Sequence, residues 1–325
     1  MTHHETDSVE PFRPRRTVTM ADVEQLETLA GTWRSEDYRY GGGSCRDAIV
    51  SYLDSSTALL AMPATEPVQT ALRVALADLH NLAGWTCFDS GRPGVAHTHF
   101  RAALDLAREA GHDALVANIH YRIGRVHLHH GALANALAEF RLGEDAARKC
   151  GSLHAVALMI TNQAWTSAEM GQADDAMTLL DNGSSAFARA DRTDLPPWAV
   201  FFDDIDFGAM IGTVQATLAR LVDARYAQSA IPALSDALAA YPDEMARSTT
   251  FSLISLATCH LLAGDADEAN SVVSLVLDVS RTLRSVRPRD RMRPLKAEAD
   301  RRRGNVVLRD MAARIGAFPV PDPTG

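Results

Sequence analysis

Histidines are the residues that could most readily hold a metal ion in this chain. They concentrate at His97, His99, His120, His127, His129 and His130. A zinc site needs converging ligands, such as two histidines four residues apart on a helix with a third ligand nearby. His97 and His99 would lie on opposite sides of a helix, and His127 and His130 form only an i, i+3 pair. We therefore predict no metal site, and no motif suggests a cofactor.

Three acidic residues, Asp203, Asp204 and Asp206, follow the aromatic pair Phe201-Phe202. Paired carboxylates can act as general acid and base, but the helix dipole also favours acidic residues in the first turn of a helix. We expect the second role. No G-x-S-x-G motif, phosphate loop or dinucleotide fingerprint occurs, so we predict a chain that is not an enzyme. A catalytic helical protein using Asp203, Asp206 or the histidines is the weaker alternative.

Polar and aromatic side chains recur at helical spacing in three stretches, so each set would share one helical face. Asparagine amides suit the backbone of an extended peptide, and neighbouring arginines can bind a carboxylate or phosphate. Aromatic rings add flat apolar area at low entropic cost. The predicted ligand-binding residues are Asp78, Asn81, Trp85, Phe88, Asn118, Tyr121, Arg122, Arg125, His129, Thr161, Asn162 and Trp165.

A structural role is the alternative for each of these residues. Trp85 and Trp165 could be core aromatics between repeats. Arg122 and Arg125 could pair with acidic residues across the groove instead of binding a ligand. The candidate acidic partners are Asp78, Asp89 and Glu169.

A repeat of about 40 residues would position these side chains. The aligned sets are Gly84, Gly91, Ala96, Phe100 and Ala103; Gly124, Gly131, Ala136, Phe140 and Gly143; and Ala164, Gly171, Ala176, Leu180 and Gly183. Small residues at the first and third positions let two helices touch, the second marks a turn, and the fourth is a large apolar residue. This pattern is typical of tetratricopeptide repeats, whose helix pairs must stack to bury their apolar faces. We predict an all-α, right-handed tetratricopeptide-like solenoid of antiparallel helix pairs without strands.

The repeat divides the chain into seven segments. Turn-forming residues in Asn182–Ser185 and the pair Pro196-Pro197 are expected to interrupt the repeats, and Gly41–Gly43 is expected to form a flexible corner. The predicted segments are a disordered arm (1–18), capping helices (19–62), three repeats (63–182), an irregular connection (183–204), two further repeats (205–286), basic capping helices (287–318) and a tail (319–325).

Charge and composition limit the classes of partner. The net charge of −9 argues against direct binding of nucleic acid. Residues 281–314 are nevertheless strongly basic, and they form either a solvated helical cap or a contact for an acidic partner or nucleic acid. Four scattered cysteines without a C-x-x-C pair argue against disulfides, and no apolar run is long enough to span a membrane. We expect a cytoplasmic protein.

Several short motifs carry a family likeness. They are Asp22-Val23, Asp37-Tyr38-Arg39-Tyr40-Gly41-Gly42-Gly43, Tyr52-Leu53, Leu82-Ala83-Gly84-Trp85, Phe88-Asp89-Ser90-Gly91, Pro196-Pro197-Trp198 and Phe202-Asp203. In combination, over residues 19–315, the chain resembles the tetratricopeptide sensor half of actinobacterial (Streptomyces-type) helix-turn-helix transcriptional regulators. The resemblance implies a groove that binds a short peptide through asparagines. Only about 18 residues precede the matching region, so we expect a sensor without its own DNA-binding domain that acts through a partner.

These observations together predict a non-enzymatic regulatory protein that binds a peptide or small molecule in its concave groove. Asn81, Asn118 and Asn162 would hold the backbone of the ligand, and Arg122 and Arg125 would hold an acidic group. A protein–protein scaffold without a small ligand is the alternative. A regulatory protein or a second copy of the chain is the expected macromolecular partner.

Overall fold

The computed structural model describes residues 17–319, and within this range the chain is helical and has no strand. Most of the predicted arm and tail lies outside the described residues. The α-helices are α1 (Met20–Tyr40), α2 (Arg46–Ser56), α3 (Glu66–Asp89), α4 (Pro93–Glu109), α5 (Asp113–His129), α6 (Leu133–Lys149), α7 (Leu153–Glu169), α8 (Ala173–Ala188), α9 (Asp204–Leu221), α10 (Ala227–Ala240), α11 (Ala246–Ala263), α12 (Ala266–Ser280), α13 (Arg287–Arg301) and α14 (Val306–Gly316). Short 3₁₀ helices lie at η1 (Gly42–Ser44), η2 (Thr57–Ala61), η3 (Ala224–Tyr226) and η4 (Asp243–Met245).

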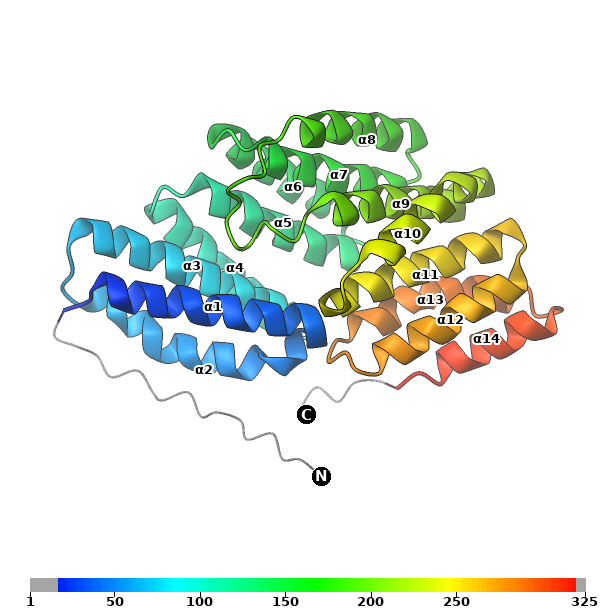
Figure 1. Cartoon of the computed structure of the whole chain (residues 1–325), viewed down its shortest axis with the longest axis horizontal. Helices are drawn as coiled ribbons and strands as arrows, with labels where there is room; N and C mark the ends of the chain where they lie inside the picture. Colours follow the sequence, from blue (N-terminus) through cyan, green and yellow to red (C-terminus); the bar gives the residue numbers. More distant parts are fainter. Residues whose placement is uncertain (1–16, 320–325) are drawn as a thin grey trace, which may run out of the picture.

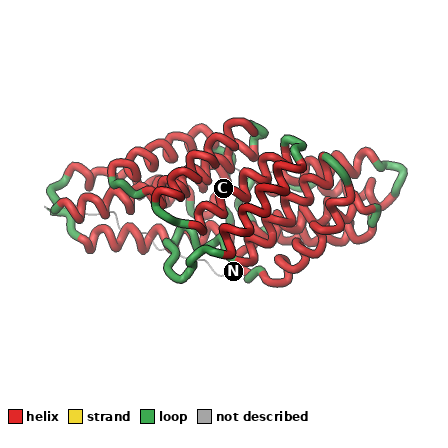
Figure 2. The backbone as a smooth tube through the Cα atoms, turned by 90° about the horizontal axis from the view of Figure 1, so that it is seen from above, coloured by secondary structure: helices red, strands yellow, loops and turns green. Residues whose placement is uncertain are grey.

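The described chain consists of helices joined by loops (Figure 2), and consecutive helices pack in adjacent pairs, which confirms the prediction of an all-α chain of paired helices. Glycines in the left-handed conformation, including Gly91, Gly131 and Gly171, end the first helix of three pairs. A Cβ atom on Gly84 would lie 2.7 Å from the Phe100 ring, so the missing side chain allows α3 and α4 to approach closely. None of the described helices is long and apolar enough to span a bilayer.

The first helix, α1, contacts α11 in the second half of the chain (Figure 1). The segment between α12 and α13 adds backbone hydrogen bonds to this closure. The Arg284 N–H donates to the Tyr40 carbonyl at 2.7 Å, the Gly43 N–H donates to the Arg284 carbonyl at 2.9 Å, and the Val286 N–H donates to the Asp89 carbonyl at 3.0 Å. The paired helices therefore form a closed arch rather than an open groove.

The glycine triplet is a packed part of this closure, not the flexible corner that the sequence suggested. The Gly42 N–H donates to Oδ2 of Asp89 at 2.8 Å. A Cβ atom on Gly42 would lie 2.7 Å from Cα of Thr86, and one on Gly43 would lie 2.7 Å from the Arg284 carbonyl oxygen. Glycine is needed here because two backbones approach the chain where a side chain would stand.

The expected turn at Asn182–Ser185 is wrong, because α8 continues to Ala188. The Ser184 hydroxyl donates to the Leu180 carbonyl at 2.8 Å, as is common for serine within a helix. A Cβ atom on Gly183 would lie 2.8 Å from Cγ2 of Thr161. Gly183 is therefore a helix-packing position, and the irregular connection spans residues 189–203 only.

Candidate ligand-binding cavity

A cavity of about 110 Å³, here called the inner cavity, lies where helices from both ends of the chain converge. Its walls come from the odd-numbered helices and from the segments before α9 and α11. It is lined by Tyr38, Trp85, Tyr121, Arg122, Arg125, Trp165, Phe201, Asp206, Ala209, Met210, Thr213, Tyr241, Met245, Arg247, Ser248, Phe251, Ser252, Arg287 and Arg291. Arginines and aromatic rings therefore dominate a site that is almost free of acidic side chains.

A second cavity of about 660 Å³, here called the outer pocket, adjoins the first between α5, α7, α9, α11 and α13. Arg125, Trp165, Thr213, Phe251 and Arg291 line both spaces. These five side chains mark the junction between the inner cavity and the outer pocket. A ligand that occupies both spaces must pass them.

Six of the residues predicted from the sequence reach these spaces. Trp85, Tyr121, Arg122, Arg125 and Trp165 line the inner cavity. His129 lines the outer pocket, where it contacts the Phe88 ring edge-on at 5.2 Å between ring centroids. Burial and three nearby arginines lower the pKa of His129 to about 2, so this ring is neutral at physiological pH.

The three asparagines do not line either space, which corrects the expectation that they hold the backbone of a ligand. Asn81 Nδ2 donates to Oδ1 of Asn118 at 2.9 Å, and Asn118 Nδ2 donates to the Trp198 carbonyl at 3.3 Å. Asn162 Nδ2 donates to the Leu158 carbonyl at 2.8 Å. Asn81 and Asn118 thus join α3, α5 and the 189–203 connection, whereas Asn162 bonds to its own helix.

Three further predicted residues also lie outside both spaces. Asp78 accepts a hydrogen bond from the Arg34 guanidinium at 2.6 Å in a buried ion pair. The Thr161 hydroxyl donates to the Ala157 carbonyl at 2.9 Å. Phe88 is 2% exposed and belongs to the main hydrophobic core. Their roles are structural.

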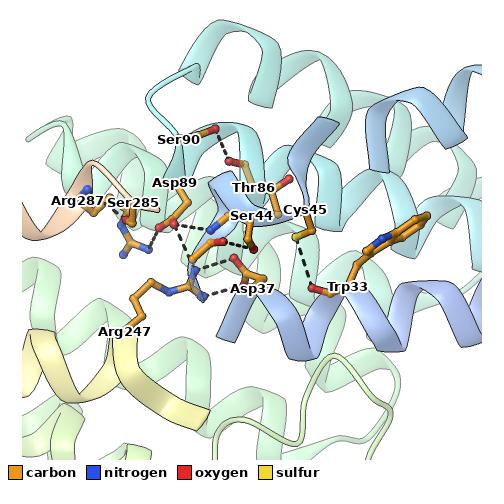
Figure 3. A network of polar contacts seen from close by, with 12 residues as sticks. Trp33, Asp37, Ser44, Cys45, Thr86, Asp89, Ser90, Arg247, Ser285 and Arg287 are labelled. Carbon is orange, nitrogen blue, oxygen red and sulfur yellow. Dashed lines mark hydrogen bonds and ion pairs between the residues drawn. The ribbon is translucent and has the colours of Figure 1, made fainter. Parts of the chain in front are cut away.

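Two aspartates and two arginines form the charged centre of the closure (Figure 3). The Arg247 guanidinium donates to both carboxylate oxygens of Asp37, at 2.7 and 2.8 Å. Asp89 lies 3.4 Å from Arg247 and 3.3 Å from Arg287. Burial alone would raise the pKa of Asp89, but Arg247 and Arg287 outweigh it and lower the pKa below its ordinary value. These four charges compensate one another.

Arg122, Arg125 and Arg291 differ, because within residues 17–319 none of them has a carboxylate within ion-pair distance. Arg122 donates to the Asn81 carbonyl at 2.9 Å, and Arg125 donates to the Asn162 side chain at 3.3 Å. Arg291 lies over the rings of Trp165 and Phe251, at 4.7 and 4.2 Å. The alternative in which Arg122 and Arg125 pair with Asp78, Asp89 or Glu169 is therefore wrong, because these carboxylates pair with other arginines.

Burial affects the charge of two of these arginines. It lowers the pKa of Arg122 to about 10. It also lowers the pKa of Arg291 well below the usual range, and the neighbouring cations Arg287 and Arg125 add to the effect. The protein environment therefore disfavours positive charge at Arg291, as expected for a cation that lacks a counter-ion.

Asp206 is the single acidic residue in the inner-cavity lining. Its backbone N–H and that of Ile205 donate to Oδ1 of Asp203, so Asp203 caps α9 and Asp206 lies in its first turn, as predicted. The Tyr241 hydroxyl donates to Oδ1 of Asp206 at 3.0 Å, whereas the buried Oδ2 has no partner among the described residues. Burial raises the pKa of Asp206 to about 7, and the bond from Tyr241 opposes this shift.

The raised pKa of Asp206 predicts a specific dependence of stability on pH. Between the ordinary value of 3.8 and about 7, the folded chain holds a proton that the unfolded chain has lost. The wild type should therefore lose stability relative to Asp206→Asn by up to about 1.4 kcal/mol per pH unit as the pH rises through this window. Urea unfolding from pH 4 to 8 measures the difference. Asp204→Asn, in the same turn but exposed, is the control, and an equal pH-dependent difference there would contradict the assignment.

Sequence reasoning missed fourteen of the nineteen residues that line the inner cavity. The missed aromatic and arginine side chains are Tyr38, Phe201, Tyr241, Arg247, Phe251, Arg287 and Arg291. They lie outside the three aligned repeats and reach the cavity only because the arch closes. The one available signal was the basic run 281–314, in which Arg287 and Arg291 are four residues apart and thus share a helical face.

Neither the geometry of metal ligands nor sequence comparison assigns a class to this site. Among the described residues, no three histidine, cysteine or acidic side chains are grouped so that they could bind a metal ion. No protein-family model matches the chain. A search of curated proteins found no similar sequence. The case for a function therefore rests on the inner cavity and the outer pocket themselves.

Proposed function

We propose that this chain is a non-enzymatic sensor of the right-handed tetratricopeptide type, which binds a peptide or small molecule in the inner cavity and the outer pocket. One observation carries the proposal: the inner cavity is lined by aromatic rings and by three guanidiniums without carboxylate partners among the described residues, of which Arg122 is buried and Arg125 and Arg291 are half-buried. Binding sites for small ligands are typically concave and largely apolar, with a few well-placed polar groups. A purely structural interior would pair or exclude such charges.

The position of the cavity suggests how binding could produce a signal. Trp85 and Tyr121 come from the first half of the chain, whereas Arg247, Phe251 and Arg291 come from the second half. A ligand that contacts both halves binds the closed arch better than an open one, so it shifts the population towards closure. The likeness to sensor halves of transcriptional regulators supports a regulatory output, which a protein partner would read.

A cavity-filling variant tests this proposal. Thr213 lines both spaces on α9, so Thr213→Trp should block the junction. We expect that a thermal-shift screen of short peptides and organic acids finds ligands that raise the melting temperature of the wild type. Thr213→Trp should abolish that rise. Leu221→Trp, at an exposed position of the same helix, is the matched control and should keep it.

The proposal is wrong if no compound in the screen shifts the wild type, or if Thr213→Trp responds to the same compounds as the wild type. In the second case the ligands bind elsewhere on the protein. A scaffold role would then be the better explanation, and it would predict a stoichiometric protein partner whose binding is unaffected by Thr213→Trp.

A further inference from the structure

We propose that the ligand is an aromatic anion, with its acidic group at the junction between Arg125 and Arg291 and a planar ring in the inner cavity. This inference rests on the proposed function, because it names the chemical class that the same site accepts. Three features carry it: uncompensated positive charge, the position of that charge, and the shape and chemistry of the remaining walls.

The charges of the inner cavity do not balance without an anion. Five guanidiniums line it, and the carboxylates of Asp37 and Asp89 compensate two of them, those of Arg247 and Arg287. The remaining arginines are Arg122, Arg125 and Arg291, and Asp206, the single acidic residue of the lining, can offset at most one of these three charges. Since an unpaired charge is costly to bury, a bound anion would relieve a cost that the unliganded protein bears.

An anion would relieve the cost of the unpaired arginine charges most at the junction between the inner cavity and the outer pocket. Arg125 and Arg291 both lie over the ring of Trp165, each at 4.7 Å from its centroid. Their positive charges repel, which contributes to the lowered pKa of Arg291. Guanidiniums bind carboxylates and phosphates through directed hydrogen bonds. An anion between Arg125 and Arg291 would attract both groups and could enter through the outer pocket.

The remaining walls suit a flat ring. Tyr121 and Phe201 stack at 5.7 Å with an interplanar angle of 25°, and Trp85 and Phe251 also line the cavity. A space of about 110 Å³ is close to the size of one aromatic ring, so a larger ligand would extend through the junction into the outer pocket. Two buried oxygens without a hydrogen-bond partner among the described residues, Oδ2 of Asp206 and the hydroxyl of Tyr38, also belong to lining residues. They could receive a donor carried by the ring.

A pair of dyes tests the anion directly. 8-Anilinonaphthalene-1-sulfonate is an aromatic anion, and N-phenyl-1-naphthylamine has the same ring skeleton without the sulfonate. Fluorescence titration of the full chain should give a dissociation constant about tenfold lower for the anionic dye. Arg291→Met and, separately, Arg125→Met should raise the constant of the anionic dye about tenfold and leave that of the neutral dye within about twofold. Arg309→Met, an exposed position on α14, is the matched control and should change neither constant.

The outcomes separate this inference from the proposed function. If Thr213→Trp leaves both dyes bound, the dyes do not occupy the cavity and the proposed function fails with them. Thr213→Trp could instead abolish the binding of both dyes while the arginine variants change the two dissociation constants equally or change neither. In that case only the assignment of an anionic ligand is overturned. Because Arg291→Met removes an unpaired charge, it should melt at or above the wild-type temperature, so loss of the fold would also contradict the assignment. Displacement of the anionic dye by indole-3-acetate or by phenyl phosphate would distinguish a carboxylate from a phosphate ligand.

Discussion

Replacing Asp89 with asparagine is expected to lower the free energy of unfolding by about 3–5 kcal/mol, because it removes one partner of a buried charge network. Asp89 is fully buried and accepts hydrogen bonds from the Gly42 N–H and from Arg287. An amide cannot compensate the charge of Arg287, and Arg247 would keep only its pair with Asp37. Urea unfolding followed by circular dichroism measures the loss.

The network also predicts how this loss depends on pH. The pKa of Asp89 is lowered in the folded state, so its contribution is complete above the unfolded value of about 3.9 and disappears as the pH falls through the lowered folded value. The difference between the wild type and Asp89→Asn should therefore be present at pH 7 and shrink in strong acid.

An exposed ion pair at the same closure provides the control. Glu244 accepts a hydrogen bond from Arg39 at 2.6 Å, and both side chains are about half exposed. Because solvent screens such pairs, Glu244→Gln should change stability little. If Glu244→Gln and Asp89→Asn had equal effects, the closure would depend on general charge and not on the buried network.

The paired helices could be predicted from the sequence because the information is local. Gly84 with Phe100 and Gly124 with Phe140 are each 16 residues apart, and they recur at a fixed offset. Contact between a small and a large residue on consecutive helices needs no knowledge of distant segments. Gly183, at the fifth aligned position, lies inside α8 against Thr161, whereas turn propensity wrongly placed a turn there.

The closure of the arch could not be predicted in this way. Asp37 and Arg247 are 210 residues apart, and Asp89 and Arg287 are 198 residues apart. No periodicity relates these residues, because they belong to non-equivalent positions of different helices. Most of the cavity lining therefore came from residues that the repeat alignment had no reason to select.

The asparagines show a different limit of sequence reasoning. Helical spacing places a residue on a face of its helix, but it does not tell whether another segment covers that face. The Trp198 carbonyl accepts a hydrogen bond from Asn118, so the irregular 189–203 connection lies over this part of the inner surface. Such a segment has no periodicity from which its path could be derived.

The packing that defines the repeat makes the second large prediction. Phe140 is completely buried, and a Cβ atom on Gly124 would stand inside van der Waals contact with its ring. Phe140→Ala should lower the free energy of unfolding by about 3–5 kcal/mol through the cavity it creates. Gly124→Ala should lower it by about 1–3 kcal/mol through overpacking, even though alanine is the better helix former.

The double variant Gly124→Ala/Phe140→Ala distinguishes this contact from two independent defects. The new methyl group would occupy part of the space that the ring leaves, so the combined loss of stability should be smaller than the sum of the single losses. Gly208→Ala is the matched control, because Gly208 lies within α9 and its Cβ would have no neighbour within 4 Å. It should raise stability by about 0.5–1 kcal/mol, which is the helix-propensity gain alone. If Gly124→Ala instead stabilised the chain as Gly208→Ala does, the close approach of α5 and α6 would not explain the glycine at this position of the repeat.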